Sequence, residues 1–370
     1  MTAVDELKWV KFHPFTDKNA FICLDDAMGD DFEIVRKARA SYGKDGKGAK
    51  QYYFELLSNH HGKEVVNQQH INKIQQLVTF RGGESIIARP YEPTEFELTE
   101  YMKREDEDRN LLRRLMRDEH TSPFEMVEFI FMVQVPMDCW RQWIRHRTAN
   151  VNEYSTRYME ALDFFQVTDP KEWRLQATDN KQGSSGFLEE WPDKWKTEEA
   201  DMYYTPQHPI STTNPNCSTP GIYLSSMEED YHRQAKLVYR ERLEAGVARE
   251  QARKDLPLST YTRAYWKCDL HNIFNFLRLR MHNHAQLEIR QFANKMYDIV
   301  KHVCPVATQA FTDYTLEAKK FSKMELEVLH RLIHFSRDYG LPGSTDKPFT
   351  IEKPRTMTER EWKDFLAKIK

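Results

Sequence analysis

The sequence has few cysteines and no long hydrophobic run. Its 370 residues include five cysteines, which are widely spaced and form no Cys-x-x-Cys pair. This odd, scattered set favours a reducing compartment and argues against a disulfide framework or a structural zinc site. No apolar stretch approaches the length of a membrane span. The first residues also lack a basic stretch followed by an apolar one, so we expect no secretory signal, no membrane partner and a cytoplasmic protein.

An excess of positive charge and a dinucleotide-binding glycine motif are also absent. The chain has 57 acidic and 54 basic residues, which give a formal net charge of -3. No global field would therefore attract nucleic acid, and any anion site must be local. No Gly-x-Gly-x-x-Gly links a strand to a helix, so a Rossmann-type nucleotide domain is not expected. The length and the 40% hydrophobic content allow one large domain or two ordinary ones.

Periodicity and capping residues predict strands beside several long helices. The run Phe124–Val135 is rich in branched and aromatic residues and reads as a mostly buried strand. A helix over Met137–Arg147 would follow and carry Arg145 at its end. Asp269 is a good N-cap for a long helix that ends before Pro305. Further helices are expected at 104–119, from the capping box Ser226–Glu229 to Gly246, at 323–338 and after Thr358. This mixture predicts an α+β (mixed α/β) fold with a central β-sheet flanked by long helices.

Residues 145–158, Arg-His-Arg-Thr-Ala-Asn-Val-Asn-Glu-Tyr-Ser-Thr-Arg-Tyr, carry the strongest functional signal. Three arginines, a histidine, a serine and a glutamate lie within thirteen positions. Arginine matches phosphate with a planar fork of N–H groups and stays charged at any working pH. The set therefore suits a phosphorylated, partly anionic small molecule. Ser155 lacks the Gly-x-Ser-x-Gly setting of an activated nucleophile, so we interpret it as a hydrogen-bond donor.

This segment resembles the signature of the flavin-dependent thymidylate synthases, which is Arg-His-Arg, seven arbitrary residues and then Ser. Other segments resemble the family in family order: His120–Glu125, Trp140–Arg145, Arg253 before Leu256-Pro257-Leu258, and Asn275–Arg280 leading into His284-Ala-Gln286. The resemblance covers roughly 115–165 and 230–310, with a weaker piece at 38–43. It implies a single catalytic domain at 1–316 with insertions at about 45–98 and 168–224, followed by a helical C-terminal extension at 317–370.

The resemblance implies a reductive methylation of dUMP to dTMP. FAD would be the cofactor, NADPH the reductant and methylenetetrahydrofolate the carbon donor. In this family the cofactor supplies the difficult chemistry while the protein positions and polarises the substrate. The family forms homotetramers with shared active sites, and no nucleic-acid partner is expected.

The resemblance assigns a nucleotide site and a flavin site that share several residues. Residues expected to bind dUMP are Gln142, Arg145, Glu153, Tyr154, Ser155, Arg157, Arg253 and Arg280. Residues expected to bind FAD are Ser41, Ser122, Arg145, His146, Arg147, Thr148, Glu153, Asp269, His271 and Asn275. His120 and His284 are expected near the flavin, where folate would stack. The family tends to carry an amide at the position of Asp269 and an arginine at that of His271, so these two flavin contacts depart from the pattern.

Arg280 is the residue to which the resemblance gives the catalytic role. A fixed cation near the N3–C4=O edge of uracil would stabilise the negative charge that builds as C5 becomes nucleophilic. No enzyme nucleophile is then required, which agrees with the absence of cysteine from the signature. On a continuous helix Arg280 and His284 would lie one turn apart and could point the same way. His282 and His284 would point to different faces of that helix, so no metal site is expected.

Two alternatives remain open at this point. A non-catalytic nucleic-acid-binding module could use the same arginines with Trp140, Trp143, Tyr154 and Tyr158, and would bind oligonucleotides with a strong dependence on salt. A relative could instead keep the flavin and deliver a different group to C5 of the pyrimidine nucleotide. The signature does not separate this second alternative from methylation.

Overall fold

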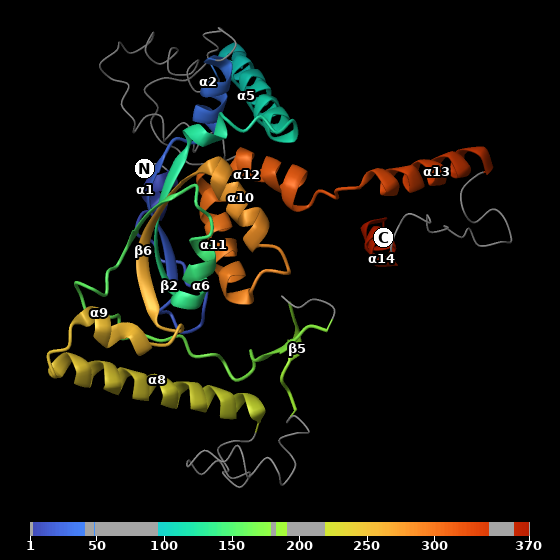
Figure 1. The fold of residues 1–370 in the computed structure, drawn as a ribbon. Coiled ribbons are helices and arrows are strands. Elements are labelled where there is room, and N and C mark those ends of the chain that lie inside the picture. The colour runs from blue at the N-terminus through green and yellow to red at the C-terminus, as the bar shows by residue number, and fades with distance from the viewer. Residues whose placement is uncertain are drawn as a thin grey trace, which may run out of the picture. The chain divides into compact units, whose positions relative to one another are not determined.

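The computed structural model describes residues 3–40, 48, 95–178, 183–190, 219–339 and 359–369. The chain divides into two compact units, Met1–Phe311 and Thr312–Lys370. The larger unit combines an antiparallel sheet with helices (Figure 1), which confirms the predicted mixed class. Ser41 and nearly all of the expected first insertion, 45–98, lie outside the described residues. Among the helices of the described ranges, none is long and apolar enough to cross a bilayer.

The central sheet has the strand order β1-β2-β6-β3, and every neighbouring pair is antiparallel. Its strands are β1 (Phe21–Met28), β2 (Glu128–Pro136), β3 (Asn150–Glu153) and β6 (Tyr261–Asp269). The predicted strand at Phe124 begins later, at Glu128. Pro123 starts a short 3-10 turn, Phe124–Met126, which buries the Phe124 ring against Phe274. The strand begins only after this turn.

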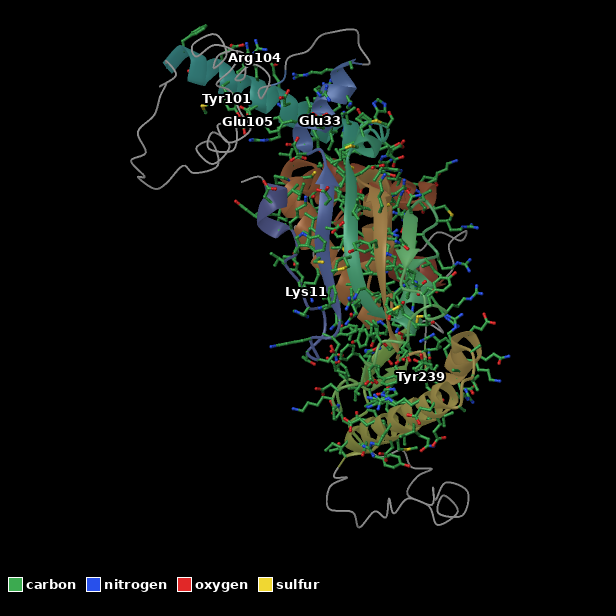
Figure 2. The ribbon with its side chains drawn as sticks, turned by 90° about the vertical axis from the view of Figure 1, so that its left-hand side faces the viewer. Lys11, Glu33, Tyr101, Arg104, Glu105 and Tyr239 are labelled. Carbon is green, nitrogen blue, oxygen red and sulfur yellow. The ribbon has the colours of Figure 1, made fainter. Side chains whose placement is uncertain are left out.

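Alternating residues give the sheet one buried face. Phe129, Phe131 and Val133 of β2 are fully buried, as is Trp266 of β6, which is paired with Phe131. Successive side chains of a strand point to opposite faces, so these residues share one face. The helices that cover it are α6 (Met137–Trp143), α10 (Leu270–Arg280), α11 (Leu287–Val303) and α12 (Pro305–Phe311). Figure 2 shows the sheet in front of α10, α11 and α12.

Helices also lie at the two ends of the sheet (Figures 1 and 2). At one end α2 (Asp31–Ala40) contacts α5 (Glu95–Arg117), and an ion pair joins Arg39 to Asp108. At the other end lies α8 (Pro220–Glu244), whose Tyr239 hydroxyl accepts a hydrogen bond of 2.9 Å from the Ala161 amide. The remaining short helices are α1 (Ala3–Leu7), α9 (Arg249–Ala252) and the 3-10 turn Arg253–Asp255.

The helix α8 starts earlier than its sequence suggested. Thr219 is the N-cap, accepting a hydrogen bond from the Ile222 amide, and Pro220 occupies the first turn. The predicted capping box at Ser226 is therefore wrong, because Ser226 lies inside the helix. A proline in the first turn lacks only an N–H that has no helical partner there, so it favours this start. The expected stop is correct: Gly246 has a φ of +80°, a conformation that glycine adopts without strain.

The second expected insertion, 168–224, has regular structure in part. It contains a β-hairpin formed by β4 (Arg174–Gln176) and β5 (Ser184–Phe187). The base of the hairpin lies against the start of α8, where a Cβ added to Gly221 would come within 1.9 Å of the Pro170 carbonyl oxygen. Only glycine permits so close an approach of the two backbones.

In its described residues, the smaller unit has two α-helices and an apolar core of its own. It contains a π-helical turn (Thr312–Leu316), α13 (Lys323–Tyr339) and α14 (Glu359–Ile369). Val328 and Phe365 are buried, and five partly buried residues pack against them: Phe321, Met324, Leu329, Trp362 and Leu366. Glu325 is buried and forms an ion pair of 2.7 Å with Lys368, which joins the two helices.

Candidate active site

The signature begins in a turn that follows α6. The predicted helix over Met137–Arg147 ends at Trp143, and a backbone hydrogen bond of 3.0 Å from His146 to the Trp143 carbonyl closes the turn. The helix must end there because the chain pairs with β6 from Asn150 onward. Trp143 is fully buried and fixes the turn on the core. Its ring lies 4.8–5.8 Å from those of Trp266, Phe276 and Phe292.

Arg280 lies against this turn and has neutral partners. Its Nε donates a hydrogen bond of 3.2 Å to Nε2 of His146, and its Nη2 donates one of 3.0 Å to the Gln142 carbonyl. No carboxylate pairs with Arg280 in the part of the chain that the structure describes. Burial lowers the pKa of Arg280 from its ordinary value, because the charged form loses hydration. The structure thus holds a partly buried cation whose charge the described protein groups do not neutralise.

His146 is a neutral hydrogen-bond acceptor at physiological pH. Burial lowers its pKa to about 4, and the positive charge of Arg280 acts in the same direction. Since a guanidinium can only donate, Nε2 of His146 must be unprotonated. The neutral ring therefore carries its proton on Nδ1. His146 consequently presents one donor, while its acceptor is used to orient Arg280.

Hydrogen bonds between side chains hold Gln142, whose carbonyl accepts from Arg280. The Nε2 group of Gln142 donates to Oε1 of Gln286, and Nε2 of Gln286 donates to Asp138 at 3.0 Å. Gln286 is the N-terminal flanking residue of α11. The family-like segment at 284–286 contains Gln286, but sequence reasoning gave it no role, because its partner Gln142 is 144 positions away.

The start of α10 brings a second group of expected flavin residues together. Asp269 caps the helix, as predicted, and its two oxygens accept from the amide and the side chain of Asn272 at 2.9 and 2.7 Å. Thr148 of the signature donates to the other end of the Asn272 side chain at 2.8 Å. One turn further, Asn275 and His271 share a hydrogen bond of 3.3 Å.

The long helix predicted from Asp269 to Pro305 is wrong, because it is broken after Arg280. Residues 281–286 form a turn between α10 and α11, and His284 lies in this turn. Arg280 and His284 therefore do not lie one turn apart on a single helix. The turn allows α11 to pack against α10. The pattern of apolar residues in the sequence does not indicate that the helix ends after Arg280.

The second half of the signature runs along the sheet edge and then toward α9. Glu153, on β3, accepts a hydrogen bond of 2.8 Å from Thr262, and the Tyr154 amide donates to the Arg263 carbonyl at 2.7 Å. The Oγ of Ser155 accepts a hydrogen bond of 3.4 Å from the Arg157 amide.

Two arginines lie near this second half. Arg253 donates from its guanidinium to the hydroxyl of Thr156, which places it beside the signature although it lies 97 positions away. Arg157 forms an exposed ion pair of 3.2 Å with Glu250.

Eight of the expected residues are exposed: His120, Ser122, Arg145, Arg147, Thr148, Glu153, Arg157 and His284. Arg145 and Arg147 flank His146 and present two cations at the surface of the turn. Within the described ranges, no hydrogen bond joins His120, Ser122 or His284 to the clusters around Arg280 and Asp269.

The cysteines of the described ranges are unsuited to nucleophilic catalysis. Cys23, Cys139, Cys268 and Cys304 are buried free thiols. Burial raises the pKa of each above its ordinary value, and that of Cys23 to about 11. A buried thiol with a raised pKa is not ionised at neutral pH and does not react readily. Among the described residues, the arginines and polar groups of the site are therefore its chemically useful side chains.

Comparison with known proteins identifies the family to which the chain is similar. Residues 24–306 match the family model described as thymidylate synthase complementing protein. The chain is 44% identical over 227 residues to a flavin-dependent thymidylate synthase of Dictyostelium discoideum, covering 61% of this chain and 65% of that protein. It is 40% identical over 268 residues to one of Treponema denticola, covering 72% and 89%, and 37% identical over 320 residues to one of Thermus thermophilus, covering 86% and 85%.

A solved structure shares the fold. It is a UMP/dUMP methylase PolB from Streptomyces cacaoi bound with 5-Br UMP, which aligns with a TM-score of 0.51 and 23% identity over 81% of this chain and 96% of that one. At this identity the likeness concerns the fold alone. The family model covers the sheet, the signature turn and the Arg280 helix together, so the resemblance noted in the sequence is confirmed. The chain belongs to the family of enzymes named flavin-dependent thymidylate synthases.

Proposed function

We propose that this protein converts dUMP to dTMP, with methylenetetrahydrofolate as the carbon donor and NADPH as the reductant acting through FAD. Family membership supports the reaction type. The observation that carries the proposal for this chain is the cation of Arg280, which is partly buried and has only neutral partners. An unneutralised, positioned guanidinium is the group needed where negative charge develops on a substrate.

The donor set around Arg280 fits a pyrimidine monophosphate. A phosphate dianion requires cations and N–H donors that are not already paired with acids. Arg145 is exposed in the signature turn that Arg280 contacts, and Arg253 lies against the second half of the signature. Gln142, Glu153, Tyr154, Ser155 and Arg157 are the further groups we propose for dUMP. Of these, Arg157 has an acidic partner, but both members of that pair are exposed and the ligand could replace the acid.

The groups around α10 fit a flavin nucleotide. His146, with its proton on Nδ1, Arg147 and Thr148 lie next to one another, and Asn275 lies on the adjacent helix. Asp269 directs its carboxylate to Asn272, so the acid is used as a helix cap rather than left facing a diphosphate. We propose Ser41, Ser122 and His271 as further flavin contacts, with His120 and His284 in the vicinity of the flavin and folate. FAD, when bound, would take reducing equivalents from NADPH and supply those that reduce the transferred carbon to a methyl group.

Arg280 would act on the uracil ring. As C5 becomes nucleophilic, negative charge spreads to the N3–C4=O edge, and a guanidinium held there lowers the energy of that state. Two contacts, to His146 and to the Gln142 carbonyl, restrict its side-chain freedom before substrate arrives. Such preorganisation avoids reorganisation during the reaction.

An anaerobic assay tests the proposal. Purified protein should carry a yellow chromophore and should form dTMP when dUMP, NADPH and methylenetetrahydrofolate are all present. Omission of any one of the three should abolish product. A colourless protein that forms no dTMP even with added FAD would contradict the proposal. Product mass separates methylation from delivery of another C5 group.

We also propose a homotetramer for the active assembly. Three large apolar residues are exposed on α8, namely Met227, Tyr231 and Leu237. Association would remove such surface from water. Light scattering coupled to gel filtration should give four times the mass of the 44.1 kDa chain. A monomer that forms dTMP at full rate would rule the tetramer out.

A further inference from the structure

The β4–β5 hairpin carries an arginine that contacts the core near the proposed nucleotide site. Arg174, the first residue of β4, donates to Glu288 in the first turn of α11 at 2.6 Å. The side chains are only 22% and 13% exposed. Figure 1 shows the hairpin between α8 and the helices that cover the sheet. A largely desolvated pair like this one differs from the exposed ion pairs of α8, because removing one partner leaves a buried charge.

The hairpin base is fixed, so the position of Arg174 is determined by the fold. Trp173, its neighbour, donates from the indole nitrogen to the Ser225 hydroxyl of α8 at 2.9 Å. That hydroxyl in turn donates to the Thr168 carbonyl at 2.6 Å, and Gly221 admits the Pro170 backbone. Arg174 therefore reaches α11 from a rigid support.

The ion pair lies at the end of α11 from which Gln286 extends. Glu288 is two residues after Gln286, whose side chain bridges Asp138 and Gln142. The carbonyl of Gln142 is one of the two acceptors of Arg280. A displacement of the start of α11 would thus be passed through Gln286 to Gln142 and then to Arg280.

The Arg174 guanidinium compensates the negative charge of the largely buried Glu288 carboxylate. Its second carboxylate oxygen is buried and has no hydrogen-bond partner within the described part of the chain. The Cys139 thiol of α6 lies in the same environment: burial raises its pKa, as do the charges of Asp138 and Glu288, while the charge of Arg174 lowers it. Arg174 is therefore the cation of a cluster that contains two carboxylates behind α6.

We propose that Arg174 is a positioning residue for the pyrimidine nucleotide, acting through Glu288, Gln286 and Gln142. The inference rests on the proposed binding of dUMP. It gives the hairpin of the second insertion a role at the site: the hairpin holds the start of α11 so that Gln142 and Arg280 keep their places.

Titration of the FAD-loaded protein with dUMP, followed by the flavin absorbance and by calorimetry, tests this role. Arg174→Ala should weaken dUMP binding on the order of tenfold, because a small displacement of a binding group has a large effect. FAD content should be unchanged and FAD affinity should change much less than dUMP affinity, since the contacts around Asp269 do not involve this network. Arg174→Lys, which keeps the charge, should restore most of the binding. The matched control is Arg233→Ala, which removes an exposed pair with Asp230 within α8 and should bind dUMP like the parent.

A double-variant cycle separates positioning from a general loss of stability. Gln286→Ala should weaken dUMP binding by itself, and adding Arg174→Ala should weaken it little further, because both changes interrupt the same chain of contacts. Losses that multiply would overturn the inference, as would an Arg174→Ala protein that binds dUMP normally. If Arg174→Ala does not fold, Glu288→Gln provides the same test with a shape-conserving change. Failure of the parent protein to bind dUMP would instead count against the proposed function.

Discussion

Arg280 and His146 are 134 positions apart in the chain, yet the guanidinium Nε of Arg280 donates directly to the imidazole Nε2 of His146. The contact joins the end of α10 to the turn after α6. It assigns a single tautomer to His146 and orients Arg280 without neutralising its charge. This relationship explains how the signature histidine can serve the site without acid–base chemistry.

Loss of the Arg280 guanidinium should abolish most turnover while leaving the protein folded. We expect Arg280→Ala to retain FAD and to lower kcat by roughly 10²–10³-fold, the effect of removing one donor to a developing oxyanion. Steady-state and single-turnover measurements of dTMP formation check the prediction. Arg278→Ala is the control, since Arg278 is exposed on the same helix. Unchanged turnover in Arg280→Ala would remove the role assigned to this residue.

The lowered pKa of His146 predicts a loss of stability in acid. Its pKa is about 4 in the folded protein and near its ordinary 6.5 when unfolded, so on acidification the unfolded chain takes up a proton first. The free energy of unfolding should therefore fall as the pH drops from about 6.5 to 4, by on the order of 1 kcal/mol, because His146 is only half-buried and solvent screens part of the effect. Urea unfolding across this range should show a smaller slope for His146→Gln than for the parent. An equal slope, or the same change in the exposed-site control His282→Gln, would contradict the prediction.

Asp31 should have the opposite pH dependence. It is buried and accepts from the amides of Val306 and Ala307 at 2.7 and 2.9 Å, capping α12, and burial raises its pKa to about 7. The folded protein keeps the proton longer than the unfolded chain. The contribution of Asp31 to stability is thus greatest below about pH 4 and is lost as the pH rises to 7. Relative to Asp31→Asn, the parent should lose on the order of 4 kcal/mol across this window. The control Asp298→Asn, at an exposed position, should differ from the parent by a constant amount across this window. If the free energy of unfolding of the parent and of Asp31→Asn changed in parallel with pH, the prediction would be wrong.

The substitution Phe365→Ala should destabilise the smaller unit without affecting the flavin site. Phe365 is fully buried in its core, and truncating a buried Phe costs about 3–5 kcal/mol. Phe365→Ala should therefore speed hydrogen exchange in α13 and α14 while exchange in β2 and the FAD content stay unchanged. The control is Lys363→Ala, which is exposed on the same helix. Loss of FAD in Phe365→Ala would show that the two units are coupled.

Local patterns were sufficient to predict part of the fold. The run that became β2 has the branched and aromatic residues of a buried strand, and Asp269 has the side chain that caps a helix. Both depend on neighbours within a few positions. The errors occurred at element ends: α6 stops at Trp143, α8 starts at Pro220, and a turn separates α10 from α11. There, pairing or packing with distant segments overrides local preference.

The sequence by itself determined the chemistry of the signature turn, because the identity and order of Arg145, His146, Arg147 and Ser155 are a property of one contiguous segment. Only the tertiary structure decided how the turn is used. It places Arg280 on His146, Gln286 on Gln142 and Arg174 on Glu288, pairs separated by more than a hundred positions. The physical reason is that charge compensation and burial depend on which groups are in contact. The packing of α10, α11 and the hairpin determines those contacts.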